Sequence, residues 1–174
     1  MPSTAATSTA RAKAGAARRR QAASRAPNAI TMLKQDHEAV AELVDKYERG
    51  KNRLSSQRMQ KMAREICRML TIHATLEEEL FYPTAREQVR GLEDMLDEAE
   101  IEHATVKELI GTVENSTPDD ELYDARIKVI GEYVKHHVKE EQNEIFPKVR
   151  KSKLDLEDLG EQMQARRQEL EAET

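Results

Sequence analysis

The 174-residue sequence contains few cysteine, aromatic, glycine and proline residues, and their scarcity excludes several classes of structure. The single cysteine, Cys67, excludes an internal disulfide and a zinc site built from cysteines alone, and it fits a reducing compartment. Aromatic residues make up 3% of the chain and charged residues 35%, with six glycines and five prolines. This composition predicts an all-helical chain. No apolar run approaches the length of a membrane-spanning helix, so we expect a cytoplasmic protein with no membrane partner.

Acidic residues are also missing from the first 29 positions. These positions carry a charge of +6, which leaves −11 on the remainder of a chain whose net charge is −5. Residues 1–28 lack hydrophobic periodicity, so we expect a disordered basic arm ahead of one domain over residues 29–172. A solvated tail without a specific role is the simplest interpretation. The composition also suits an organellar transit peptide, or an arm that contacts nucleic acid phosphates or an acidic partner.

What the chain does contain is one motif used twice. The segment from His73 to Pro83 is echoed by the segment from His137 to Pro147. In each copy the histidine is followed four residues later by a glutamate and ten residues later by a proline, with an aromatic residue just before the proline. Four residues is slightly more than one helical turn, so each histidine shares a helix face with its glutamate, Glu77 or Glu141.

The apolar periodicity predicts four long helices and one shorter helix. We expect them over about residues 29–49, 55–82, 92–115, 117–147 and 154–170, with a connecting segment between Pro83 and Gly91. Thr117-Pro118-Asp119-Asp120 is a helix-start signal for the fourth. Short connections within the first and second pairs imply antiparallel neighbours. The expected fold class is all-α, an up-down antiparallel four-helix bundle with an appended C-terminal helix packed outside it.

Four histidines occupy positions in these helical stripes where apolar residues are expected, which places them in the core with the two glutamates. An ionised carboxylate in a dry core requires a partner or takes up a proton. A lone buried histidine is usually only hydrogen bonded, but a duplicated pattern of four favours a pair of metal ions. Two histidines per ion, with both glutamates bridging, leave positions for an oxo or hydroxo bridge and a small molecule. The predicted metal ligands are His37, His73, Glu77, His103, His137 and Glu141.

The remaining polar residues receive simpler interpretations. His136 points about 100° away from His137 around the helix and is expected to face solvent or the residues that surround the ligands, without being a ligand itself. Glu78, Glu79, Glu140 and Glu144 are expected to form a solvated acidic face, from which one carboxylate can hydrogen bond a ligand imidazole. The four tyrosines are assigned to packing, although one near the metal ions can donate a hydrogen bond. Cys67 is expected to be an inert, half-buried thiol, and no catalytic residue or organic cofactor is predicted.

Together these motifs resemble the hemerythrin-like (HHE) cation-binding domain of bacteria, over about residues 30–170. The resemblance implies a non-haem di-iron centre, with two iron ions bound by the six residues, that reacts with oxygen, peroxide or nitric oxide or senses oxygen or iron. Two departures stand out. Oxygen-carrying hemerythrins have a fifth histidine where this chain has Lys107, and an aspartate with wider spacing where it has Glu141. Both argue against reversible oxygen carriage.

Four classes of function therefore remain open. The first is a di-iron module that binds or senses a small oxidant or iron status, and the second is a di-iron enzyme that decomposes peroxide or nitric oxide. The third is an iron-storage protein. The fourth is a metal-free helical interaction module whose basic arm binds nucleic acid or an acidic partner.

Overall fold

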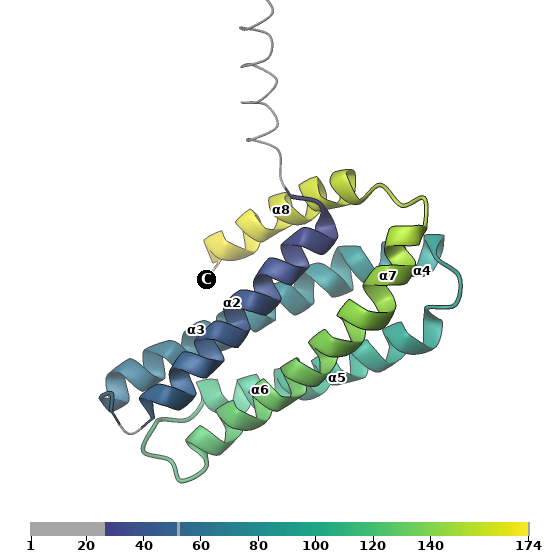
Figure 1. Ribbon diagram of the computed structural model, residues 1–174. Helices are drawn as coiled ribbons and strands as arrows, with labels where there is room; N and C mark the ends of the chain where they lie inside the picture. The colour runs from purple at the N-terminus through teal and green to yellow at the C-terminus, as the bar shows by residue number, and fades with distance from the viewer. Residues whose placement is uncertain (1–26, 52, 174) are drawn as a thin grey trace, which may run out of the picture.

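The computed structural model describes residues 27–51 and 53–173, so nearly all of the predicted basic arm lies outside it. The described residues form five helical rods and no strand (Figure 1). The all-α bundle predicted from the sequence is confirmed. The rods are α2 (Ala29–Gly50); α3 (Ser56–Leu76) with the π-helical turn η1 (Glu77–Phe81) and α4 (Tyr82–Gln88); α5 (Glu93–Glu114); α6 (Tyr123–Glu140) with the π-helical turn η2 (Glu141–Ile145) and α7 (Phe146–Lys151); and α8 (Leu156–Glu173).

Two helical hairpins make up the bundle. The first pairs α2 with the α3–α4 rod, and the second pairs α5 with the α6–α7 rod, each across a short connection. The first helix begins as the sequence predicts, because the side chain of Asn28 accepts a hydrogen bond from the Thr31 N–H at 3.0 Å. Ser55 precedes α3 in the extended conformation expected of an N-cap.

The prediction that the second helix stops at Pro83 is wrong. Instead, the wide turn η1 ends at Phe81, and α4 continues to Gln88 with proline in its first turn. Proline has no N–H to donate, but in the first turn of a helical segment that N–H would find no acceptor within the segment. Pro83 therefore removes no hydrogen bond of α4, and the chain stays helical. Pro147 occupies the same place after η2, and that rod continues to Lys151.

The start of the fourth helix also differs from the prediction. The residues from Thr117 to Leu122 form turns, and α6 begins at Tyr123. The Asp120 side chain accepts a hydrogen bond from the Thr117 N–H at 2.6 Å, and the Asp120 N–H donates to the Thr117 carbonyl. These bonds close a tight turn, so the capping residues that suggested a helix start are used locally instead.

The fifth helix packs outside the bundle, as expected. It lies across the start of α2 and against α3, and it buries Leu159 and Met163 there (Figure 1). Gly160 allows this close approach, because a Cβ at that position would lie 2.3 Å from the Pro27 carbonyl oxygen. A side chain at this position would force the two segments apart.

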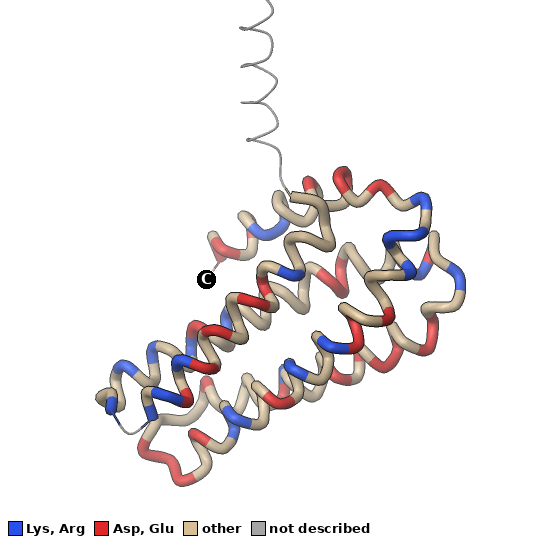
Figure 2. Tube along the Cα trace, in the orientation of Figure 1, with Lys and Arg blue, Asp and Glu red and all other residues tan. Residues whose placement is uncertain are grey.

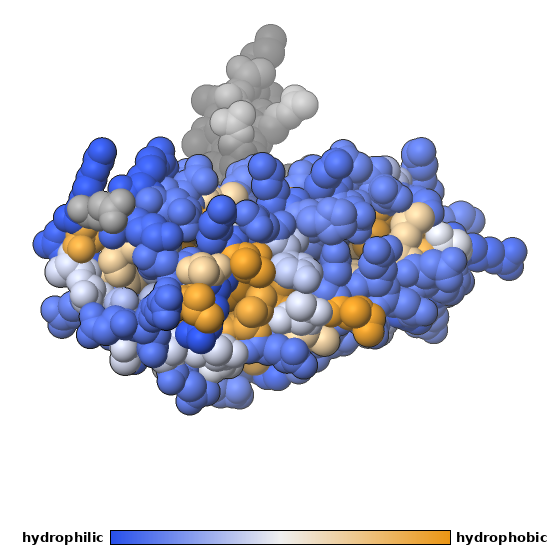
Figure 3. All heavy atoms as spheres, turned by 90° about the horizontal axis from the view of Figure 1, so that it is seen from below, coloured by the Kyte–Doolittle hydropathy of each residue, from blue (hydrophilic) through white to orange (hydrophobic). Residues whose placement is uncertain are grey.

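The core is divided into two apolar clusters. One surrounds Leu33, Leu76 and Phe81, and the other surrounds Ile66 and Ile127. Charged residues line the outside of every helix, and α5 alone carries eight acidic residues and one lysine (Figure 2). The face seen from below is largely hydrophilic around a small apolar patch (Figure 3). No helix among the described residues is long and apolar enough to span a membrane.

Candidate metal centre

Six polar side chains lie in the core of the bundle. Among the described residues, the buried histidines and carboxylates are the same six that the sequence predicted as ligands: His37, His73, Glu77, His103, His137 and Glu141. The two glutamates have no solvent exposure. All four long rods contribute, because α2 and α5 supply one histidine each and the other two rods supply a histidine and a glutamate.

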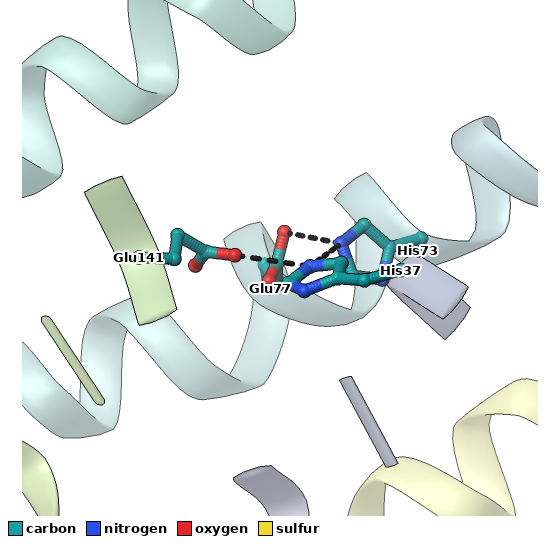
Figure 4. A group of neighbouring side chains, drawn as sticks. All are labelled: His37, His73, Glu77 and Glu141. Carbon is teal, nitrogen blue, oxygen red and sulfur yellow. Dashed lines mark hydrogen bonds and ion pairs between the residues drawn. The ribbon is translucent and has the colours of Figure 1, made fainter. Parts of the chain in front are cut away.

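The first group of these side chains comprises His37, His73, Glu77 and Glu141 (Figure 4). The two histidine Nε2 atoms are 3.1 Å apart. The Nε2 of His73 lies 3.2 Å from Glu77 Oε2, and the Nε2 of His37 lies 3.2 Å from Glu141 Oε2. Four ligand atoms from three rods therefore converge on one point.

The second group comprises Glu77, His103 and His137. Its two Nε2 atoms are 3.2 Å apart, and the Nε2 of His103 lies 3.3 Å from the same Glu77 oxygen that faces His73. Glu77 thus belongs to both groups. Glu141 also approaches this group, with its Oε2 3.5 Å from the Nε2 of His137.

The spacing of these atoms fits metal coordination. Ligand atoms about 2.1 Å from one ion lie roughly 3.0–3.4 Å apart at octahedral or tetrahedral angles. The carboxylates support the same reading, because Glu77 Oε1 and Glu141 Oε2 are buried without a hydrogen-bond partner. Glu141 Oε2 approaches two imidazole nitrogens without hydrogen-bond geometry. Cations would supply the missing partners.

The π-helical turns begin at the two glutamates. In η1 the Tyr82 N–H donates to the Glu77 carbonyl, and in η2 the Phe146 N–H donates to the Glu141 carbonyl. Such wide turns are rare and are often found at functional sites. Here each turn places an aromatic ring five residues after its glutamate beside a histidine. Tyr82 stacks on His103 with ring centroids 5.6 Å apart, and Phe146 stacks on His37 at 6.0 Å.

All four imidazoles also have a partner on the Nδ1 side. The carboxylates of Asp36, Glu78 and Glu102 lie 3.3, 3.0 and 2.8 Å from the Nδ1 atoms of His73, His103 and His137. The side-chain amide nitrogen of Gln142 lies 3.2 Å from the Nδ1 of His37. A carboxylate that accepts the Nδ1 proton leaves Nε2 free as a ligand and fixes the ring orientation.

Sequence reasoning proposed such a role for one of several glutamates, which Glu78 fulfils, but it missed the other three partners. A signal was present for two of them. An acidic residue directly precedes the first histidine of each half, as Asp36-His37 and Glu102-His103, and each contacts the second histidine of its half. Gln142 follows Glu141 as Glu78 follows Glu77, so the same position of the repeat supplies an Nδ1 partner in both copies.

Opposite charges within the core shift the pKa values of the protein groups in the absence of a cation. Burial raises the pKa of the Glu77 carboxyl, but the imidazoles of His73 and His103 outweigh burial and hold it well below its usual range. Burial lowers the pKa of His73, yet the carboxylates of Glu77 and Asp36 raise it to about 10. Burial also lowers the pKa of His137, but the carboxylates of Glu102 and Glu141 outweigh burial and hold that pKa well above its usual value. Metal ions must therefore displace protons from these imidazoles.

Tyr82 is the tyrosine that lies beside the centre, where the sequence left open a role as hydrogen-bond donor in addition to packing. It is buried, and its hydroxyl donates to Glu141 Oε1 at 3.1 Å while lying 3.5 Å from Glu77 Oε2. Burial and the Glu141 carboxylate raise the pKa of this phenol well above its usual value, so it stays protonated. The centre thus has a neutral hydrogen-bond donor at one side.

Three other residues complete the account. The side chain of His136 is 57% exposed, as predicted, and contacts Glu140 and Glu102. The Lys107 ammonium donates to Glu78 Oε1 at 2.7 Å, and the same oxygen lies 3.0 Å from the Nδ1 of His103. Cys67 is fully buried rather than half-buried, because α3 turns it into the cluster around Ile66.

A helical bundle with two buried groups of histidine and carboxylate ligands that share one glutamate defines a metal-binding protein. The family model described as "Hemerythrin HHE cation binding domain" matches residues 28–149, and the chain belongs to this family. The crystal structure of a hemerythrin HHE cation binding domain-containing protein from Mycobacterium kansasii, a homolog of Rv2633c, is similar at a TM-score of 0.69 and 22% identity. The match covers 84% of this chain and 89% of that chain. No curated protein matches the sequence.

Proposed function

We propose that this protein is a non-haem di-iron protein that binds or senses oxygen, a related small oxidant such as peroxide or nitric oxide, or iron status. The observation that carries the proposal is the sharing of Glu77, whose single Oε2 atom lies 3.2 Å from His73 and 3.3 Å from His103. A carboxylate between two pairs of imidazoles is what a dinuclear centre requires. Imidazole and carboxylate ligands together suit iron, and four histidines are more than magnesium or calcium would use.

The ligand roles follow from the contacts. His37 and His73 would hold one ion and His103 and His137 the other, with Glu77 between them and Glu141 completing the first set. Two iron ions bound there would supply one-electron redox chemistry and open coordination positions for a small molecule. Asp36, Glu78 and Glu102 would keep three of the rings oriented by accepting their Nδ1 protons.

The space beside the ligands suits a small, uncharged molecule. A cavity of about 30 Å³ lies between the four histidines and an apolar wall. Its volume exceeds what one water requires and is small enough to exclude most organic substrates. The apolar wall favours oxygen or nitric oxide over an anion. It is formed by Val40, Leu70, Val106, Ile110, Val134 and Val138.

The two ends of the centre are not equivalent, which suggests where that molecule binds. The first group has four close ligands, and the second has three. Lys107 lies where oxygen carriers place a further histidine, and its ammonium pairs with Glu78 instead of facing the centre. The ion held by His103 and His137 would therefore have the more open coordination.

Metal analysis of the purified protein tests the proposal. We expect about two irons per chain, and the loss of both in Glu77→Ala, because that side chain serves both groups. The matched control is Glu79→Ala in the same turn, whose carboxylate is partly exposed and pairs with Arg166 at 2.7 Å. Iron content near zero in wild type, or full content in Glu77→Ala, would contradict the assignment.

A second candidate is an enzyme that decomposes peroxide or nitric oxide at the same centre. The specific observation in its favour is Tyr82, a buried hydrogen-bond donor 3.1 Å from Glu141 and beside His137, because a fixed donor can stabilise the negative charge that develops on a substrate as it is reduced. Turnover measurements separate the two candidates. Repeated consumption of peroxide or nitric oxide by one equivalent of protein supports the enzyme, and a single stoichiometric spectral change supports the binding module.

A further inference from the structure

We propose that a second, outer cation site lies at the surface between α5 and α6, formed by Glu102, His136 and Glu140, and that it takes divalent metal ions on their way to the buried centre. Its transit role rests on the proposed function, because the buried centre must be loaded with metal. The site itself uses none of the six buried ligands.

Three potential ligand atoms converge there. The Nε2 of His136 lies 3.2 Å from Glu140 Oε1 and 3.6 Å from Glu102 Oε1, and one ligand atom from each residue lies within 4.8 Å of the others. His136 and Glu140 are four residues apart on α6 and so share a helix face. One imidazole and two carboxylates are a suitable set for a transition-metal dication, with water in the remaining positions.

Glu102 connects this outer site to the buried centre. Its Oε2 lies 2.8 Å from the Nδ1 of His137, while its Oε1 faces His136. A cation at the outer site would therefore share a carboxylate with the ring of a buried ligand. One residue, Glu102, therefore lies between the two positions.

A cavity joins the two positions as well. About 170 Å³ in volume, it is lined by Glu102 and Glu140 of the outer site and by His137 and Glu141 of the buried centre. Five of the nine residues that line this cavity are glutamates, so the space between the two positions suits a cation rather than an anion.

Further acidic side chains surround the opening. Glu98 and Glu144 also line the cavity, and α5 carries eight acidic residues and one lysine (Figure 2). A cleft lined by charges of one sign concentrates ions of the opposite sign. The partial exposure of the ligands favours weak and rapidly exchanging binding, which suits transfer better than storage.

A zinc titration of the full-length, metal-free protein tests the outer site. Calorimetry combined with equilibrium dialysis should show two tightly bound equivalents and a third, weaker one in wild type. His136→Ala and Glu140→Gln should keep the two tight equivalents and lose the third. His136 is the one histidine outside the buried centre, so surface binding by other imidazoles does not obscure the result. The matched control is Glu132→Gln on the same helix, an exposed glutamate paired with Lys128, which should retain all three.

Loading kinetics test the transit role. After mixing with ferrous ion, His136→Ala and Glu140→Gln should fill the buried centre severalfold more slowly than wild type and Glu132→Gln, and reach the same final content. A third equivalent absent from wild type, or unaffected by both variants, overturns the outer site, and unchanged loading rates overturn its role in transit. Absence of the two tight equivalents in wild type would instead contradict the proposed function.

Discussion

The Arg167 guanidinium of α8 donates to both carboxylate oxygens of Asp36 on α2, and Asp36 in turn lies 3.3 Å from the Nδ1 of His73. The appended helix is therefore linked to His73, a buried candidate ligand, through a single side chain. Burial raises the pKa of the Asp36 carboxyl, but His73 and Arg167 outweigh burial and hold it below its usual value, so it remains a strong acceptor. A helix outside the bundle thus contributes to the orientation of the His73 ring inside it.

Replacing Arg167 with alanine should weaken metal binding without removing any ligand. Loss of the guanidinium frees Asp36 to turn toward solvent and leaves the ring of His73 less constrained. Loss of a direct partner of a metal ligand typically reduces metal affinity by about 10-fold to 100-fold, and because Arg167 acts through Asp36 we expect a reduction of at most about 10-fold. Competition with a chelator measures the change. Arg166→Ala is the control, because Arg166 pairs instead with Glu79 and Glu169 at the surface, and equal effects of both variants would contradict the link.

Gly160→Ala should destabilise the protein through the contact between α8 and the start of α2. The added Cβ would lie 2.3 Å from the Pro27 carbonyl oxygen and 2.9 Å from the Ala29 nitrogen, and both are backbone atoms that cannot rotate away. We expect a loss of about 1–3 kcal/mol in the free energy of unfolding, measured by chemical denaturation. The control is Gly111→Ala in α5, where no atom lies within 4 Å of the added Cβ. That change should stabilise the helix by about 0.5–1 kcal/mol.

The sequence predicted which six side chains meet in the core because the same constraint acts twice. A histidine at an apolar position is ambiguous alone, but His73 and His137 recur with a glutamate at the same spacing and a proline at the same distance. The helical spacing of the histidines and the repetition of the motif together identify these residues as a group. The structure brings together all six residues that were expected to meet.

Other features depend on interactions that no local pattern encodes. Pro83 predicts the end of a helix, but the π-helical turn before it allows the rod to continue. That turn, which begins at Glu77, has no recognised signal in the sequence. Arg167 lies 131 residues from Asp36, so their pairing follows only from the docking of α8. Tyr82 resembles a core aromatic until its hydroxyl is found beside Glu141.

Cys67 should be unreactive in the folded protein. Its side chain is fully buried, and burial raises the pKa of the thiol to about 12. Since the thiolate is the reactive form, alkylation by iodoacetamide at neutral pH should be slow in the native state and fast in denaturant, as followed by intact mass. Rapid labelling of native protein would mean that α3 opens locally more often than its packing around Ile66 suggests.

The metal-free protein should lose stability as the pH rises above neutral. The pKa of His73 is raised from 6.5 to about 10 in the folded state, so its contribution to folding is complete below pH 6.5 and disappears as the pH rises toward 10. The lowered pKa of Glu77 makes the stability depend on pH in the acidic range instead. Its contribution is present above pH 4.5 and is lost as the pH falls through the folded value. The metal-free protein is therefore expected to be most stable between these two limits.

The metal-loaded protein should show the opposite trend between about pH 6 and pH 9, because cations bind deprotonated imidazoles and compete with protons for His73 and His137. Loading should release protons, which calorimetry in buffers of different ionisation enthalpy detects. The difference in melting temperature between the loaded and metal-free forms should therefore widen as the pH rises. Parallel melting curves across this range would mean that the imidazoles do not exchange protons for metal, and would contradict their assignment as ligands.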